Sequence, residues 1–151
     1  MKITYLNRAS LDQFKERVSN LDSNSQRQWG SMTLDEMLEH VLYLLRVAME
    51  EIDAKFEGNF VTRSFVGFMI FRFLPFPKGK IKSFDAALPS PHADVEQLKT
   101  ELCEALERFV DTLEVDPERK TLSPLLGPTT MQVWSLVQGR HTEHHLTQFG
   151  V

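Results

Sequence analysis

Apolar positions recur at helical spacing along most of the chain and predict five helical segments. In the first half they predict a short helix from Ser10 to about Leu21, a long amphipathic helix from Thr33 to about Phe56, and a third from about Val61 to Leu74. In the second half they predict helices from Ser90 to about Asp116 and from Thr129 to about Gln148. We find no internal repeat and no convincing strand. The predicted fold class is therefore all-α, an up-and-down four-helix bundle with one additional short helix.

Start and stop signals set the expected ends of these helices. Ser10–Gln13 and Thr33–Glu36 have the form of capping boxes, in which two side chains satisfy free amides of the first turn. Ser90–Pro91 is expected to supply an N-cap followed by the first helical residue. Gly58–Asn59 is expected to end the second helix. The irregular stretch Pro75–Pro91 is expected to cover a functional site, because loops of this length are often functional.

Length and charge narrow the class of protein. The 151 residues suit a single domain, 1–151, that can bury a core without disulfides. Seventeen Lys and Arg against 21 Asp and Glu give a net charge of −4, and this acidic balance opposes a nucleic-acid binder. Cys103 is the one cysteine, which fits a reducing compartment. No apolar run has the form of a signal peptide or the ~20 residues of a membrane span, so we expect a cytoplasmic protein without a membrane partner.

Three of the five histidines lie on the predicted last helix. At about 100° per residue, His141 and His145 share one face of that helix, one turn apart. Two imidazoles in this arrangement can hold a single metal ion. His144 is rotated by about 100° from His145, so we do not expect it to join the same ion.

A third ligand is expected from another helix, and His40 is the candidate. It stands beside Met37 and Leu44, at the edge of the apolar stripe of the predicted second helix. Three neutral imidazoles suit a borderline divalent cation such as Zn, Ni or Fe, and three protein ligands leave positions for water or substrate. The alternative is that these histidines are hydrogen-bonded residues of the core or its rim.

Other polar and aromatic residues allow two interpretations each. Gln148 can donate to a metal ligand or a bound water, or it is only a polar helix end. Glu36 can act as a base near His40, although its place in the capping box is the preferred interpretation. The Lys78–Lys82 cluster can meet an anionic substrate, but a solvated loop is the commoner case. The two tryptophans either line a pocket or supply packing area; they are Trp29 and Trp134.

Two sequence signatures make the chain similar to the DinB/YfiT-like superfamily. The first covers residues 29–40 and reads WGSMTLDEMLEH, and the second covers residues 141–150 and reads HTEHHLTQFG, with Trp134 before it. Within the superfamily the chain resembles a bacterial branch that carries both signatures. The resemblance covers the ends of the chain best, whereas residues 57–92 match only in the overall helical plan.

The resemblance implies a four-helix bundle with a three-histidine metal site made by His40, His141 and His145, with His144 outside it. Characterised members include thiol-cofactor-dependent transferases and isomerases, and metal-dependent hydrolases. The expected function is therefore a metal-dependent enzyme that activates water or a thiol cofactor for hydrolysis or transfer on a small molecule. The alternatives are a metal- or ligand-binding module without turnover, or an interaction protein that uses the apolar stretch Phe65–Phe71. A homodimer is compatible with each.

Overall fold

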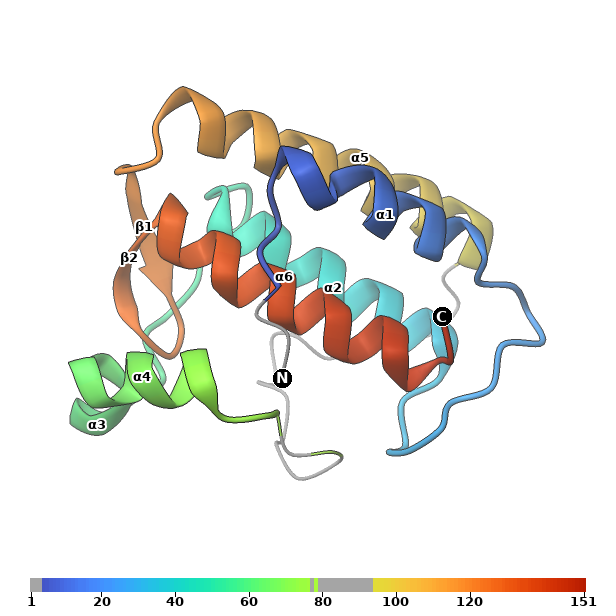
Figure 1. Ribbon diagram of the computed structural model, residues 1–151, viewed down its shortest axis with the longest axis horizontal. Coiled ribbons are helices and arrows are strands. Elements are labelled where there is room, and N and C mark those ends of the chain that lie inside the picture. Colours follow the sequence, from blue (N-terminus) through green and yellow to red (C-terminus); the bar gives the residue numbers. More distant parts are fainter. Residues whose placement is uncertain (1–3, 77, 79–93) are drawn as a thin grey trace.

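The computed structural model describes residues 4–76, 78 and 94–151, and these residues are mostly helical (Figure 1). The elements follow one another in this order: α1 (Arg8–Ser19), α2 (Leu34–Ala48), α3 (Phe60–Arg63), α4 (Phe65–Phe73), α5 (Val95–Val115), β1 (Lys120–Ser123), β2 (Gly127–Thr130) and α6 (Met131–Gln148). The helices of the described ranges include none that combines the length and the apolarity that a bilayer crossing needs.

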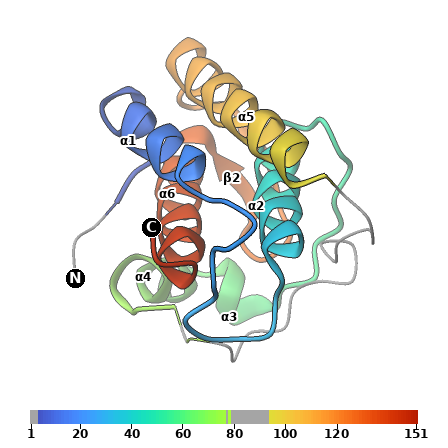
Figure 2. The ribbon, with the colours of Figure 1, turned by 90° about the vertical axis from the view of Figure 1, so that its right-hand side faces the viewer.

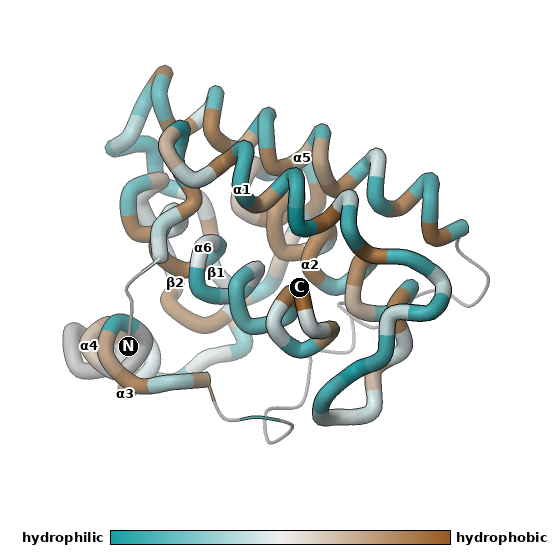
Figure 3. The backbone as a smooth tube through the Cα atoms, turned by 45° about the vertical axis from the view of Figure 1, so that its right-hand side comes forward, coloured by the Kyte–Doolittle hydropathy of each residue, from teal (hydrophilic) through white to brown (hydrophobic). Residues whose placement is uncertain are grey.

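Four of the helices, α1, α2, α5 and α6, lie side by side around one hydrophobic core (Figures 1 and 2). Hydrophobic and hydrophilic residues recur at each turn of α1 and α5 (Figure 3), as expected for helices that bury one face. Burying a large apolar side chain contributes about 1.5–3 kcal/mol. The largest fully buried side chains are Trp134, Phe109, Leu6, Leu21, Met37, Leu38, Leu45, Leu102, Leu106, Met131, Leu136 and Leu146.

The directions of these four helices differ from the predicted up-and-down order. Helices α2 and α5 run the same way, because Arg46 pairs with Glu101 at 3.2 Å and Glu51 pairs with Arg108 at 2.9 Å, so the residue numbers rise together. Helices α1 and α6 also run the same way, opposite to the first pair (Figure 1). Helix α5 therefore begins beside the start of α2, and strict alternation is not observed.

The capping signals at the first two helices are partly as predicted. Helix α1 begins at Arg8, two residues before the predicted start, because Asn7 is its N-cap: the Oδ1 of Asn7 accepts from the amide of Ser10 at 3.2 Å. Thr33 is the N-cap of α2 as predicted, and its amide donates to Glu36 Oε2 at 2.8 Å. This α2 ends at Ala48 instead of Phe56, since Glu50 adopts a left-handed φ of 59° that an α-helix cannot continue.

The predicted third helix is two helices, α3 and α4, separated by Ser64 in an extended conformation. Both lie beside the four long helices rather than among them (Figures 1 and 2). Several of their large apolar side chains, and others next to them in the chain, are exposed: Phe56, Phe60, Val61, Phe73 and Leu74.

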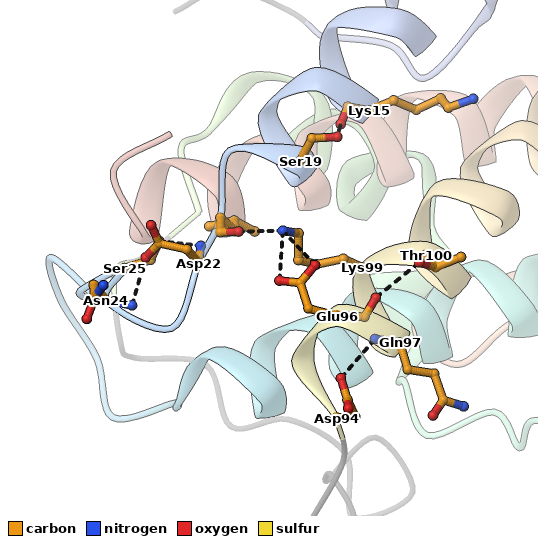
Figure 4. A network of polar contacts seen from close by, with 11 residues as sticks. Lys15, Ser19, Asp22, Asn24, Ser25, Asp94, Glu96, Gln97, Lys99 and Thr100 are labelled. Atoms are coloured by element: carbon orange, nitrogen blue, oxygen red, sulfur yellow. Dashed lines mark hydrogen bonds and ion pairs between the residues drawn. The ribbon is translucent and has the colours of Figure 1, made fainter.

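Helix α5 begins at Val95, with Asp94 as its N-cap in place of the predicted Ser90. The Oδ1 of Asp94 accepts from the amide of Gln97 at 3.1 Å (Figure 4). One turn later Lys99 donates to the backbone oxygen of Leu21 at 2.6 Å and ties α5 to the chain after α1. Ser90, Pro91 and His92 lie outside the described residues, as does most of the expected loop over the site.

A short hairpin precedes α6 where the sequence predicted only a loop. Strands β1 and β2 pair antiparallel, with Lys120 opposite Thr130 and Ser123 opposite Gly127. Trp134 Nε1 donates to Thr121 Oγ1 at 2.7 Å, and this hydroxyl donates to the backbone oxygen of Ala48 at 2.8 Å. The hairpin thereby joins the end of α2 to the beginning of α6. Trp134 supplies packing area, as the commoner of the two interpretations expected.

The backbone of residues 4–6 packs directly against α6. Leu6 donates to the backbone oxygen of Ser135 at 2.9 Å, and Ser135 Oγ donates back to the Leu6 carbonyl at 2.7 Å. One turn along, a Cβ atom added at Gly139 would lie 2.5 Å from the Thr4 carbonyl oxygen. The absence of a side chain at Gly139 is therefore what lets the two backbones approach.

Candidate metal centre

The three histidines singled out from the sequence meet at one place. His40 comes from α2, and His141 and His145 come from α6. Each offers one ring nitrogen, and these nitrogens all lie within 4.8 Å of one another. The ring centroids form a nearly equal-sided triangle, with separations of 4.7, 4.9 and 4.7 Å. We call this cluster the histidine triad.

The antiparallel packing of α2 and α6 brings the triad together. His40 Nε2 and His141 Nε2 are 2.8 Å apart, so two rings face each other across the helix interface. One turn away Gln138 Nε2 donates to the backbone oxygen of Leu44 at 2.8 Å and fixes the register of the two helices. His145 follows His141 by one turn of α6, as the sequence spacing predicted.

Burial keeps the imidazoles of α6 in the neutral form that binds metals. It lowers the pKa of His145 to about 3, and the nearby His40 lowers it in the same direction. The pKa of His141 lies well below its ordinary value, first because of burial and then because of His145 and His40. At neutral pH these two rings therefore carry nitrogen lone pairs, which a divalent cation requires of a histidine ligand.

A hydrogen bond fixes which nitrogen of His145 carries the lone pair. Gln148 Nε2 donates to the backbone oxygen of Trp29 at 3.0 Å, so the amide oxygen of Gln148 must face the other way. That oxygen lies 2.9 Å from His145 Nδ1, which therefore carries the proton and donates. The Nε2 atom is left with the lone pair, the arrangement in which an outer hydrogen bond orients a metal-binding histidine.

Gln148 thus contacts a predicted metal ligand, but through its acceptor end instead of the expected donor end. The loop before α2 is packed tightly against this amide. Gly30 has a φ of +78°, and a Cβ atom there would lie 2.8 Å from Gln148 Nε2. The backbone N–H of Gln28 also donates to the backbone oxygen of Gln148 at 2.7 Å. The link from Trp29 through Gln148 to His145 could not be read from helical spacing, because it uses a loop carbonyl.

The triad fits a divalent cation by the chemistry of its donors. Among the described residues, the cluster that can hold an ion consists of three histidines and includes no Asp or Glu. Glu36 has the capping role that was preferred for it. The Nδ1 atom of His141 is buried and has no hydrogen-bond partner in the described part of the chain, so no Nδ1 contact fixes its tautomer as Gln148 does for His145.

His144 lies outside the triad, as predicted, and faces a set of aromatic rings. Its ring centroid is 5.1 Å from that of His145, 5.7 Å from that of Trp29 and 5.6 Å from that of Phe76. Burial lowers the pKa of His144, and the charge of Lys78 adds to this effect. The contact with Phe76 was not predicted, because Leu74 and Phe76 approach α6 only through the tertiary fold.

Comparisons of the chain with protein-family models, with curated proteins and with solved structures give no match. The histidine triad and the residues around it are therefore the features of this chain that point to a function.

Proposed function

We propose that this protein is a metal-dependent enzyme in which His40, His141 and His145 bind one divalent cation. The observation that carries the proposal is the triad itself, three ring nitrogens from two helices within 4.8 Å of one another. A set of three neutral imidazoles suits Zn, Ni or Fe. Three protein ligands are typical of sites that keep a position for water or substrate, whereas structural sites are closed by four.

A bound cation of this kind supplies Lewis acidity, which lowers the pKa of a water molecule or a thiol and polarises a substrate. The protein residues hold the ligand set in place. Gln148 holds the His145 ring with its Nε2 lone pair available. The buried surroundings keep His141 neutral, so no proton has to leave it before a cation binds. We propose hydrolysis or group transfer on a small molecule as the reaction class, with water or a thiol cofactor as the nucleophile.

We further propose that the chain is a DinB/YfiT-like four-helix bundle. The two segments that carry the resemblance, residues 29–40 and 141–150, are also the segments that build the site. They contact each other through His40 and His141, and through Trp29 and Gln148. A shared site explains why these two segments resemble the superfamily in sequence, whereas residues 57–92 match it only in the overall helical plan.

A metal-binding module without turnover is the second candidate, and the composition of the triad favours it. In the described part of the chain no carboxylate joins the triad. Both ends of the Gln148 amide are occupied, and Glu36 caps α2. A protein that only stores or senses a ligand needs no group to move a proton.

Metal content tests the proposed site, and His144 provides the matched control. Untagged protein is dialysed against ZnCl₂ and then against buffer, and zinc is measured by elemental analysis. We expect about one zinc per chain in the wild type and in His144→Ala, and none in His141→Ala, with helical circular dichroism retained in all three. Unchanged zinc in His141→Ala would refute the assignment. A second assay separates the enzyme from the binding module by measuring turnover of small esters, or of electrophiles that accept a thiol. Turnover by the wild type that is lost in His141→Ala supports the enzyme.

A further inference from the structure

A row of rings and cations lies beside the histidine triad. Lys78 Nζ lies 4.2 Å from the centroid of the Trp29 ring, and Trp29 packs edge-on against His144. Phe76 also packs edge-on against the His144 ring. The His144 ring also contacts His145 of the triad, with centroids 5.1 Å apart. The row therefore leads from the candidate metal centre to an exposed ammonium group.

The members of this row come from three separate parts of the chain. Trp29 belongs to the loop before α2, Phe76 and Lys78 follow α4, and His144 lies on α6. Arg140 stabilises the arrangement, because its guanidinium lies 5.0 Å from the Phe76 centroid and donates to the backbone oxygen of Leu74. A lysine that is merely solvated does not need contacts from three separate parts of the chain. This arrangement therefore indicates a role for the exposed ammonium group of Lys78.

Among the described residues no carboxylate lies close enough to Lys78 to form an ion pair with it. Within the described ranges Lys78 makes no ion pair, although most of the other cations that line the long helices do, Arg8, Lys15, Arg17, Arg46, Lys99 and Arg108 among them. The triad adds no negative charge either, since it consists of three histidines and includes no carboxylate. A divalent cation held there keeps its full charge, and the ammonium of Lys78 adds another. Both would attract the same kind of group, an anion.

We propose that the substrate of this site carries an anionic oxygen group, a carboxylate or a phosphate, which Lys78 binds beside the triad. The rings of Trp29, His144 and Phe76 supply the adjacent surface for the rest of the molecule. This inference rests on the proposed metal site and adds the class of substrate to it. Lys78 is the specificity-determining residue, because its ammonium is the exposed cation of the row.

Cobalt provides a probe that separates metal binding from anion binding. Co²⁺ is loaded into the full chain, and its visible absorption is followed while inorganic phosphate or acetate is added. Lys78→Met is compared with Lys120→Met, which removes the same charge from an exposed position on β1. We expect all three proteins to bind Co²⁺ equally well. We expect Lys78→Met to bind the anion about fivefold more weakly, as for the loss of one exposed ion pair, and Lys120→Met to match the wild type.

The outcomes distinguish the two levels of the proposal. Normal Co²⁺ binding with equal anion affinity in both lysine variants, or with no spectral response to either anion, overturns the assignment of Lys78 and leaves the metal site standing. Failure of the wild type to bind Co²⁺ overturns the metal site and the substrate class together. A response to phosphate alone or to acetate alone, weakened in Lys78→Met, supports the proposal and identifies which anionic group is preferred.

Discussion

Replacing Gln148 tests whether the outer hydrogen bond of His145 matters to the site. In Gln148→Ala the buried Nδ1–H of His145 loses its acceptor and the Trp29 carbonyl loses its donor. Leaving a buried polar group unsatisfied costs about 1–3 kcal/mol. The contact with the Trp29 carbonyl is only part-buried and costs less, so we expect a loss of about 2–4 kcal/mol for the two. At about 2–4 °C per kcal/mol for a chain of this size, the melting temperature falls by roughly 5–15 °C. Loss of such an orienting contact weakens metal binding about 10–100-fold.

Gln148→Glu separates the two contacts of this amide. A carboxylate still accepts from His145 Nδ1–H, but it cannot donate to the Trp29 carbonyl. We therefore expect the variant to lose stability while it retains most of its zinc affinity. Zinc affinity is measured by competition with a chromophoric chelator, and stability by thermal unfolding in EDTA. Gln132→Ala, an exposed change in the first turn of α6, is the control. A Gln148→Ala protein with the zinc affinity of this control would refute the orienting role.

Two further predictions concern stability. Gly139→Ala places a Cβ atom 2.5 Å from the Thr4 carbonyl oxygen and 2.6 Å from the Leu6 amide nitrogen. We therefore expect the free energy of unfolding, measured with denaturant, to fall by about 1–3 kcal/mol. An unchanged denaturation midpoint would contradict the close packing of residues 4–6 on α6. The metal-free protein should lose stability on acidification from pH 6.5 towards pH 3, because the unfolded His145 takes up a proton near its ordinary pKa, whereas burial lowers its folded pKa to about 3. This contribution is fully present above pH 6.5, and below that the free energy of unfolding falls by up to about 1.4 kcal/mol per pH unit. The contribution should be absent from His145→Gln. Equal slopes of unfolding free energy against pH in the two proteins would count against it.

The helix faces that the three histidines occupy were predictable, because those faces depend on local helix geometry. The spacing of His141 and His145 fixes their common face, and the position of His40 beside an apolar stripe directs it towards the interior. The N-cap of α1 was less predictable, since Asn7 and Ser10 are both good capping residues and the chain places Ser10 at the third helical position. Whether Asn7 or Ser10 becomes the N-cap depends on contacts that cannot be predicted from helical spacing.

The remaining differences come from contacts between distant segments. The predicted direction of α5 was wrong because the helix buries its apolar face equally well in either direction. A connection as long as residues 49–94 permits both. The hairpin was missed because its strands have four residues each and Pro124 and Pro128 give the segment the composition of a loop. The Trp29–Gln148–His145 link needs a backbone carbonyl whose position depends on the left-handed conformation of Gly30.

The helix order has a consequence for how this protein acquires its structure. Helix α1 packs on α5 and α6, so its partners are far away along the chain: Arg8 meets Glu114 across 106 positions and Arg17 meets Glu143 across 126. Such a high contact order predicts slower folding than is usual for helical proteins, whose contacts are mainly local. The facing rings of His40 and His141 close a loop of 101 positions. An ion that joins them would act as a reversible cross-link, which favours the native chain over the unfolded one by mass action.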